Sequence, residues 1–145
     1  MMTAFYSLAG ASVLTKKIGG KENTELHGNL AFAAAMAAGF GGYVIWTNKD
    51  MYGKAHLTTD HGQFGALTLT LMLAYPIVSY ILYNPESGFL RQHQLFRKVH
   101  KYTGKLILVF GLVTSAYGIM AMEQEPIQAA GLIGALLIST PVFLF

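Results

Sequence analysis

The sequence predicts an all-α integral membrane protein, a bundle of four transmembrane helices preceded by a short interfacial segment. Three observations support this prediction. The 145 residues are 53% hydrophobic, and their mean hydropathy is +0.43. Only 12% of them are charged, about half of the ~25% that is usual in soluble domains. Four apolar runs are each long enough to cross about 30 Å of hydrocarbon.

The predicted spans are separated by connections that carry charged residues, Asn, Gly and Pro, which favour turns. The four spans are residues 26–47, 61–83, 99–122 and 127–145. Together they form one predicted membrane domain, residues 26–145. The N-terminal segment, residues 1–25, is apolar only as far as Leu14 and is too short to span. We expect it to lie at the interface or to pack against a partner, since its lysines follow the apolar stretch instead of preceding it as in a signal peptide.

Basic residues are distributed unequally between the two sides that four spans define. One side carries Lys16, Lys17, Lys21, Arg91, Arg97, Lys98, Lys101 and Lys105. The other side carries Lys49 and Lys54. Because basic residues beside helix ends favour the cytoplasmic side, we expect both termini to face the cytoplasm or its equivalent, the plastid stroma or the mitochondrial matrix.

The composition argues against several classes of function. The pI is near 9.2, but basic residues scattered among so many apolar ones make a poor phosphate-binding face, so we expect no nucleic-acid partner. The chain has no Cys, which excludes disulfides and thiolate metal sites. It has no phosphate-binding loop and no dinucleotide fingerprint. We therefore expect an electron-transfer or structural subunit more than an independent enzyme.

Small residues are frequent inside the predicted spans. Ala and Gly crowd residues 33–42, and Gly111, Ser115 and Gly118 lie along the third span. Such residues let helices approach closely where no hydrophobic effect drives their association. The same gaps would also admit a flat cofactor, and the sequence leaves both interpretations open.

Three of the five histidines begin predicted spans. His27 and His100 begin the first and third spans, which run in the same direction from the basic side, so both belong to one leaflet. His61 begins the second span on the opposite side. Each has Ala or Gly four residues later on the same helix face. A histidine-ligated porphyrin needs such a clear patch, and imidazole is a standard axial ligand of haem.

Other roles for these histidines stay open at this stage. Two of them in one leaflet would give a six-coordinate electron-transfer haem, but histidines at helix ends also cap helices or bind headgroups. A single histidine would also suit the magnesium of a chlorophyll. A closed zinc site requires three or four ligands at one depth, and the sequence shows no such group. We expect His56 and His93, outside the hydrocarbon, to be ordinary interface residues.

Aromatic residues lie along the spans and near their ends. They include Tyr43, Trp46, Tyr52, Tyr75, Tyr80 and Tyr83. Tyr and Trp are typical of the aromatic belts at membrane interfaces, which is the role we expect for most of them. Electron hopping through one of them is the alternative.

Three segments resemble the cytochrome b-561 superfamily of transmembrane electron carriers, and the similarity covers residues 26–122. They are Leu26-His27-Gly28, Asp60-His61-Gly62-Gln63-Phe64-Gly65 and Arg97-Lys98-Val99-His100-Lys101-Tyr102-Thr103-Gly104. In that superfamily, four core helices hold two haems, one near each membrane face. The first and third core helices ligate one haem, and the second and fourth ligate the other.

The resemblance implies that His27 and His100 ligate the iron of one haem b, and that His61 is half of a second site. The predicted span 127–145 contains no His and no Met, so the other half would have to come from a partner. We therefore expect at most one bis-histidine haem. Phe96-Arg97-Lys98-Val99-His100 also resembles a small cyanobacterial and plastid branch of the superfamily, which implies a thylakoid or another organelle membrane.

The predicted function is that of a membrane b-type cytochrome, a subunit of a larger electron-transfer complex whose partners are lipids and other membrane subunits. Lys101 and Lys105 would lie near the haem propionates or face lipid phosphates. The alternative is a non-catalytic accessory subunit of a photosynthetic or respiratory complex. Such a subunit would bind lipids, chlorophyll or carotenoid, and neighbouring helices.

Overall fold

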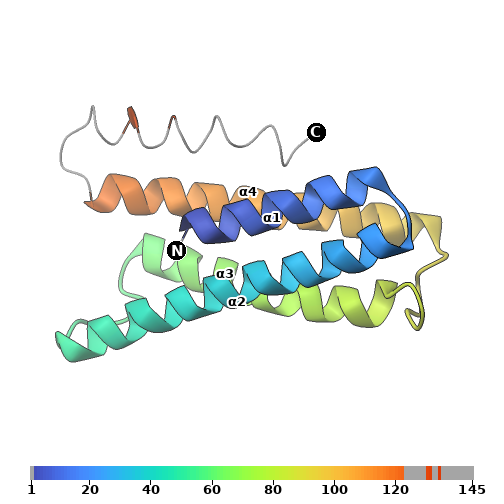
Figure 1. Ribbon diagram of the computed structural model, residues 1–145. Coiled ribbons are helices and arrows are strands. Elements are labelled where there is room, and N and C mark those ends of the chain that lie inside the picture. The colour runs from blue at the N-terminus through green and yellow to red at the C-terminus, as the bar shows by residue number, and fades with distance from the viewer. Residues whose placement is uncertain (1, 123–129, 132–133, 135–145) are drawn as a thin grey trace.

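The chain folds into a bundle of antiparallel helices, as shown by a computed structural model (Figure 1). The structure describes residues 2–122, 130–131 and 134. The main elements are the helices α1 (Met2–Ile18), α2 (Lys21–Met51), α3 (Asp60–Tyr83) and α4 (Gln94–Met122). The described residues contain no strand. The prediction of an all-α protein is therefore confirmed.

Three helices, α2, α3 and α4, are long and apolar enough to cross a membrane. They correspond to the first three predicted spans, but α2 and α4 each begin five residues earlier than the sequence predicts. Hydropathy marks only the part of a helix that lies in hydrocarbon, whereas backbone hydrogen bonding continues into the headgroup region. The fourth predicted span, residues 127–145, falls outside the described residues except at 130–131 and 134, so four spans stay a prediction.

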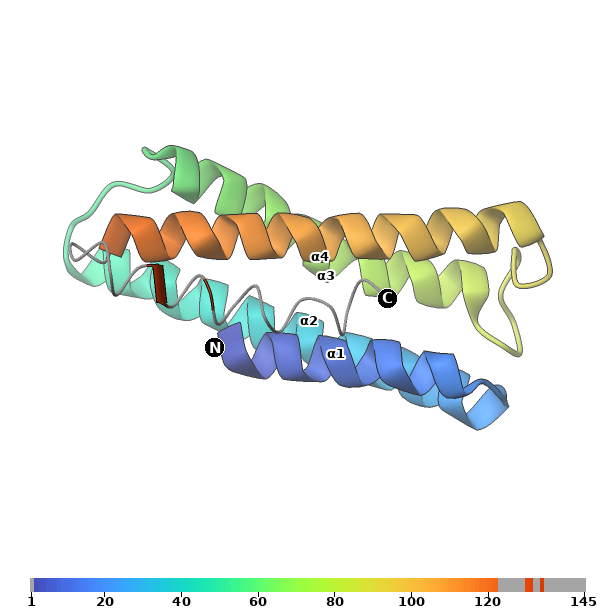
Figure 2. The same cartoon turned by 90° about the horizontal axis from the view of Figure 1, so that it is seen from above.

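The N-terminal segment forms α1, which is one of the helices of the bundle. Figures 1 and 2 both place it alongside α2. The reversal between the two helices occurs at Gly19 and Gly20, whose φ angles of 81° and 88° are readily adopted only by glycine. A hydrogen bond of 3.1 Å between the hydroxyls of Tyr6 and Ser115 joins α1 to α4. The segment therefore helps to build the bundle, and its position relative to the membrane interface stays a prediction.

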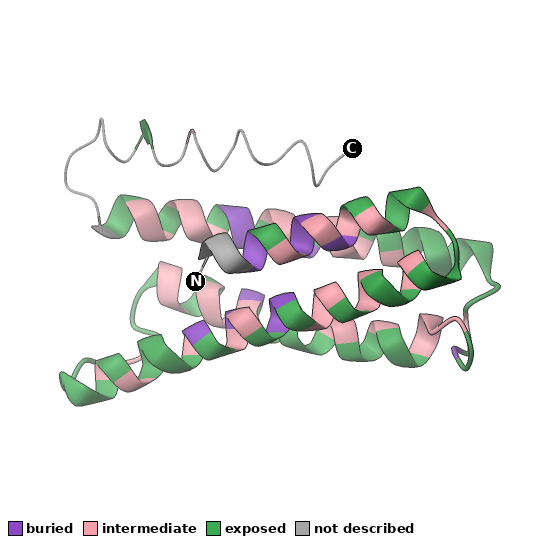
Figure 3. Cartoon of the chain, in the orientation of Figure 1, coloured by how far each residue is buried: buried purple, intermediate pink, exposed green. Residues whose placement is uncertain are grey.

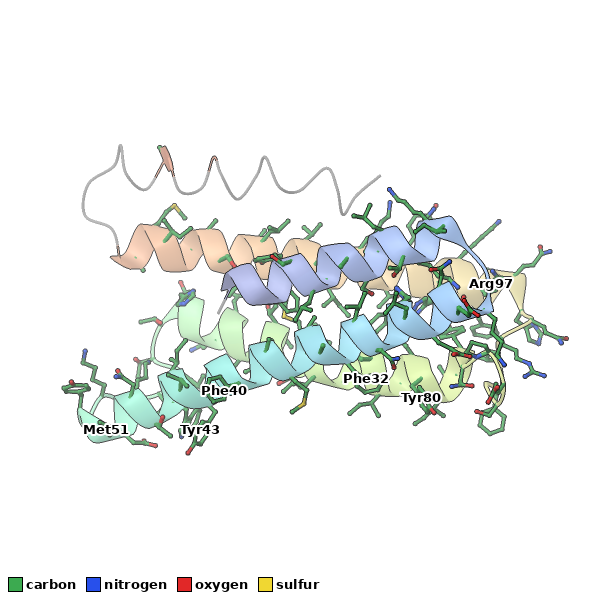
Figure 4. The ribbon with its side chains drawn as sticks, in the orientation of Figure 1. Phe32, Phe40, Tyr43, Met51, Tyr80 and Arg97 are labelled. Atoms are coloured by element: carbon green, nitrogen blue, oxygen red, sulfur yellow. The ribbon has the colours of Figure 1, made fainter. Side chains whose placement is uncertain are left out.

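The core of the bundle is small, and half of its buried residues are alanines. It lies where α1, α2 and α4 approach one another (Figure 3). Its buried residues are Phe5, Tyr6, Ala9, Ala34, Ala38 and Leu112. Large apolar side chains such as Phe40 and Tyr43 are exposed on the outside instead (Figure 4). An apolar exterior around a small core is the arrangement expected of helices that contact lipid.

Glycines in α2 allow it to approach α3 closely. A Cβ atom added at Gly39 would lie 3.1 Å from Cδ2 of Leu73 in α3, and one added at Gly42 would meet Leu69 at a still shorter distance. At these two positions the small residues serve helix packing, one of the two interpretations that the sequence left open. One residue before Leu69, α3 is joined to α4 instead: the hydroxyls of Thr68 and Thr114 form a hydrogen bond of 3.1 Å.

Two adjacent alanines in α2 test this packing. Ala34 is 3% exposed within the core, whereas Ala33 faces outward. We expect Ala34→Leu to destabilise the bundle by about 1–3 kcal/mol, because additional methylene groups overpack a closely packed core. Ala33→Leu should leave stability nearly unchanged, since its side chain would point into lipid or detergent. Unfolding in a detergent titration measures both, and equal effects of the two substitutions would contradict the described packing.

Candidate functional site

The structure brings His27 and His100 together. Helices α2 and α4 run in the same direction, and both histidines lie near the starts of their helices at the same end of the bundle (Figure 1). The centres of the two rings are 6.3 Å apart, and the ring planes lie at 87° to each other. The sequence predicted that these two residues share a leaflet, and the structure places them in direct proximity.

The His27 ring is held by Ser12 of α1. Its Nδ1 atom lies 2.8 Å from the backbone carbonyl oxygen of Ser12 and 2.8 Å from the Ser12 hydroxyl. That hydroxyl in turn donates to the backbone carbonyl of His27 at 2.9 Å. Because a carbonyl only accepts hydrogen bonds, the proton of His27 is on Nδ1. This arrangement leaves Nε2 as the nitrogen with a free lone pair.

The His100 ring is held by residues of α3. Its Nδ1 atom lies 2.9 Å from the Tyr75 hydroxyl and 3.3 Å from that of Ser79. Tyr75 stacks on His100 with 5.4 Å between ring centres and 10° between planes, and the Tyr83 ring lies 4.7 Å away at 45°. The Tyr75 hydroxyl donates its proton to the His100 carbonyl at 2.5 Å, so its oxygen is free to accept from Nδ1. Nε2 is again the nitrogen left available.

The separation of the two rings fits a metal ion bound between them. A metal–imidazole bond is about 2.0 Å long. Two imidazoles on opposite sides of one metal therefore have their nitrogens about 4 Å apart and their ring centres about 6 Å apart. The observed 6.3 Å agrees with this value. Histidines that bind metals commonly donate their other ring N–H to a carbonyl or a similar acceptor, as both do here.

A cavity of about 1550 Å³ surrounds the histidine pair. Its walls include Ala31 and Phe32 of α2 and Gly104 of α4, and Tyr80 packs against Phe32 with 6.0 Å between ring centres (Figure 4). The small residues that the sequence noted four positions after His27 and His100 thus line the cavity. Gly104 also lies beside Tyr75, and a Cβ atom at this position would be in ordinary van der Waals contact with the Tyr75 ring, at 3.5 Å.

Basic residues surround the end of this cavity at the starts of α2 and α4. They are Lys16, Lys17, Arg91, Arg97, Lys98, Lys101 and Lys105. Lys16 Nζ donates to the Thr24 hydroxyl at 2.8 Å. Although the Lys16 side chain as a whole is exposed, partial burial of its ammonium group and then the positive charge of Arg97 lower its pKa.

Few carboxylates neutralise this basic end. Two ion pairs near this end join Lys21 to Glu86 at 2.7 Å and to Glu25 at 3.9 Å. Both pairs are exposed at the start of α2. The hydrogen bond and charge of Lys21 lower the pKa of Glu86. The cavity end therefore has excess positive charge beside the two histidines and is electrostatically suited to an anionic group.

His61 lies at the opposite end of the bundle from the histidine pair. Its ring packs against Gly118 of α4, where an added Cβ atom would lie 2.9 Å from its Cε1 atom. Its Nδ1 atom is buried and has no hydrogen-bond partner among the described residues. The structure thus separates His61 from His27 and His100, in agreement with its predicted depth, and brings no second histidine to it within residues 2–122.

The remaining two histidines lie outside the cavity. His56 Nε2 bonds Asp50 Oδ1 at 2.7 Å, and its ring stacks on Trp46 with 3.8 Å between ring centres. These contacts join the end of α2 to the loop that precedes α3. His93 lies edge-on to Phe96 at 5.8 Å. Both sets of contacts are local.

The residues that hold the two histidines were not predicted from the sequence. Ser12 lies in the N-terminal segment, which was expected at the interface or against a partner, and Tyr75 was among the aromatic residues expected mostly in an aromatic belt. That expectation for Tyr75 does not match the structure, in which the side chain lies within the bundle against His100. One signal was present in the sequence. Tyr75, Ser79 and Tyr83 recur every four residues, which places three hydroxyl groups on one face of α3.

The family model described as eukaryotic cytochrome b561 matches residues 1–124, most of the chain. The match identifies the family and does not distinguish a branch within it. No curated protein and no solved structure matches the chain significantly.

The effect of the Arg97 charge on the pKa of Lys16 can be tested by substitution. We expect Arg97→Gln to raise the pKa of Lys16 toward its ordinary value, because the substitution removes one of the two causes that lower it. The rise should be partial, since burial is the larger cause. NMR of isotopically methylated lysines in detergent measures this pKa. Lys98→Gln is the matched control, and an equal rise in both variants would refute a specific Arg97–Lys16 interaction.

Proposed function

The chain belongs to the eukaryotic cytochrome b561 family and is accordingly a membrane b-type cytochrome. We propose that it binds one haem b between His27 and His100 and carries electrons through this haem. The observation that supports this proposal is the separation of 6.3 Å between the two rings, with both Nδ1 atoms already hydrogen-bonded. This geometry leaves one nitrogen of each ring for a metal. The proposal agrees with the candidate ligand pair derived from the sequence.

The residues around the pair have separate roles in this proposal. His27 and His100 would both ligate the iron of a bound haem, and such a bis-histidine iron would have no coordination position left for oxygen or substrate. A bound haem supplies one-electron chemistry at its iron. Phe32, Ala31 and Gly104 line the cavity with apolar surface, which limits access of water to the bound group. These features favour electron transfer over catalysis at the metal.

The basic end of the cavity supports the orientation of the bound group. Haem carries two propionates, and Lys101 and Lys105 were the residues that the sequence placed near them. The cavity lining adds Lys16 and Arg97, whose mutual repulsion an anion between them would relieve. We propose that the propionates face this end, toward the start of α4.

One haem site is proposed within residues 2–122. His61 is the start of a second site in the family's pattern, and its buried Nδ1 has no partner among these residues. A second axial ligand would have to come from another subunit. Electron exchange is therefore proposed at one face of the membrane only.

The helices and the charge distribution also bear on the membrane orientation and the partners of this protein. Three apolar helices imply direct contact with lipid. We propose that the basic end faces the cytoplasm, stroma or matrix, and that the chain works as a subunit of a larger electron-transfer complex. A thylakoid location and a photosynthetic role rest on the sequence resemblance alone. An accessory subunit that binds pigment in place of haem is the alternative function.

Absorbance spectroscopy of the purified chain tests the proposal. We expect a reduced-minus-oxidised spectrum with the narrow bands of a six-coordinate b-type haem, at about one haem per chain. His27→Ala and His100→Ala should each abolish these bands, because either substitution removes an axial ligand.

Two controls make the result specific. His61→Ala and His93→Ala should retain the full spectrum, since neither residue contacts the cavity. Bands of chlorophyll or carotenoid in the native protein, without b-type bands, would favour the accessory-subunit alternative. Loss of the b-type bands in His61→Ala alone would assign the haem to the opposite end of the bundle.

A further inference from the structure

We propose that Ser12 and Tyr75 are positioning residues that fix the tautomers of His27 and His100, and that they do so with unequal strength. Tautomer control is a property of the haem-free chain. The consequence for reduction potential rests on the proposed haem site between the two histidines.

The two histidines are held in the same way from different helices. Ser12 in α1 contacts both the Nδ1 atom and the backbone carbonyl of His27, at 2.8 and 2.9 Å. Tyr75 in α3 contacts the same two groups of His100, at 2.9 and 2.5 Å. In each case one hydroxyl group bonds the ring and the main chain of a single histidine. Each ring is therefore fixed relative to its own helix.

Counting the protons available to each hydroxyl and each histidine places the proton of both His27 and His100 on Nδ1. Each hydroxyl uses its one proton to donate to a carbonyl, which has none to give. The hydroxyl oxygen then accepts from Nδ1–H. At His27 the Ser12 carbonyl is a second acceptor, at 2.8 Å. The opposite tautomer would leave two acceptors facing each other at these distances.

The two histidines differ in the groups that accept the hydrogen bond from Nδ1–H. At His27 the acceptors are a peptide carbonyl and a hydroxyl, both from a residue that is 3% exposed. At His100 they are a phenol and a more distant serine hydroxyl at 3.3 Å. Hydrogen bonds from Nδ1–H increase the basicity of the ligating nitrogen. His27 keeps its carbonyl acceptor when the Ser12 side chain is removed, whereas His100 depends on side chains alone.

The tautomers are measurable without haem. We expect ¹⁵N NMR of histidine-labelled, haem-free protein in detergent to show the Nδ1–H tautomer at both His27 and His100. Tyr75→Phe should raise the fraction of the Nε2–H tautomer at His100 and leave His27 unchanged. A dominant Nε2–H tautomer at either histidine in the unmodified chain would overturn the proposal. A Tyr75→Phe spectrum identical to that of the unmodified chain would also overturn it.

The reduction potential of the haem-loaded chain tests the unequal strength. A more basic ligand stabilises the oxidised iron, so loss of a hydrogen bond from Nδ1–H should shift the potential to more positive values. We expect a clear positive shift in Tyr75→Phe, a larger one when Ser79→Ala is added, and a smaller one in Ser12→Ala. Tyr43→Phe is the matched control, since Tyr43 of α2 is exposed on the outside of the bundle and is not among the residues that line the cavity. The potential of this variant should equal that of the unmodified chain.

The outcomes separate this inference from the proposed function. A chain that binds no haem refutes the proposed function, and the tautomer measurement still decides the roles of Ser12 and Tyr75. A chain that binds haem with an unchanged potential in Tyr75→Phe, or with a shift in Ser12→Ala at least as large as in Tyr75→Phe, refutes the inference alone. A loss of folding in Tyr75→Phe is recognised by comparison with Tyr43→Phe, and the tautomers of the Ser12→Ala variant and of the unmodified chain then decide.

Discussion

Polar groups inside this bundle must find their partners within the protein, because the surrounding hydrocarbon offers none. This constraint makes the chain helical, and it also explains the contacts between helices. Tyr6 bonds Ser115, and Thr68 bonds Thr114, so hydroxyls on neighbouring helices satisfy one another. The histidine pair obeys the same rule, since each Nδ1 has a hydroxyl partner. His61 is the described exception, because its buried Nδ1 atom has no hydrogen-bond partner among the described residues.

The hydrogen bonds to the Nδ1 atoms of His27 and His100 involve all four helices. His27 and His100 come from α2 and α4, which run in the same direction, and the groups that hold them come from α1 and α3. The N-terminal helix is thus part of the site as well as of the packing core, because Ser12 follows Phe5, Tyr6 and Ala9 along its buried side. The geometry of the pair is therefore a property of the whole bundle.

Charge is concentrated at the same end as the histidines. The cations at this end include Lys16, near the end of α1, and Arg97, near the start of α4, and the charge of Arg97 lowers the pKa of Lys16. In a soluble protein, carboxylates would usually be interspersed among them. Here Lys21 takes the carboxylates of Glu25 and Glu86. The other basic residues line the cavity, and their excess at this end is also the basis of the proposed orientation in the membrane.

The sequence by itself determined that the chain is helical, that three of its apolar runs are long helices, and which histidines share an end. These properties depend on local hydropathy and on the alternating direction of successive spans, both of which are readable along the chain. The shared depth of His27 and His100 follows from the same two quantities. The family follows from short motifs around the histidines, and its model matches residues 1–124.

Only the tertiary structure decided how close the two histidines lie and what holds them. A separation of 6.3 Å depends on the rotation of each helix about its axis and on close approaches such as that of Gly39 to Leu73. Ser12 and Tyr75 reach their partners across helix interfaces, 15 and 25 residues away along the chain. Hydropathy carries no information about such pairings, because it measures how a residue interacts with its solvent and not which residue it faces.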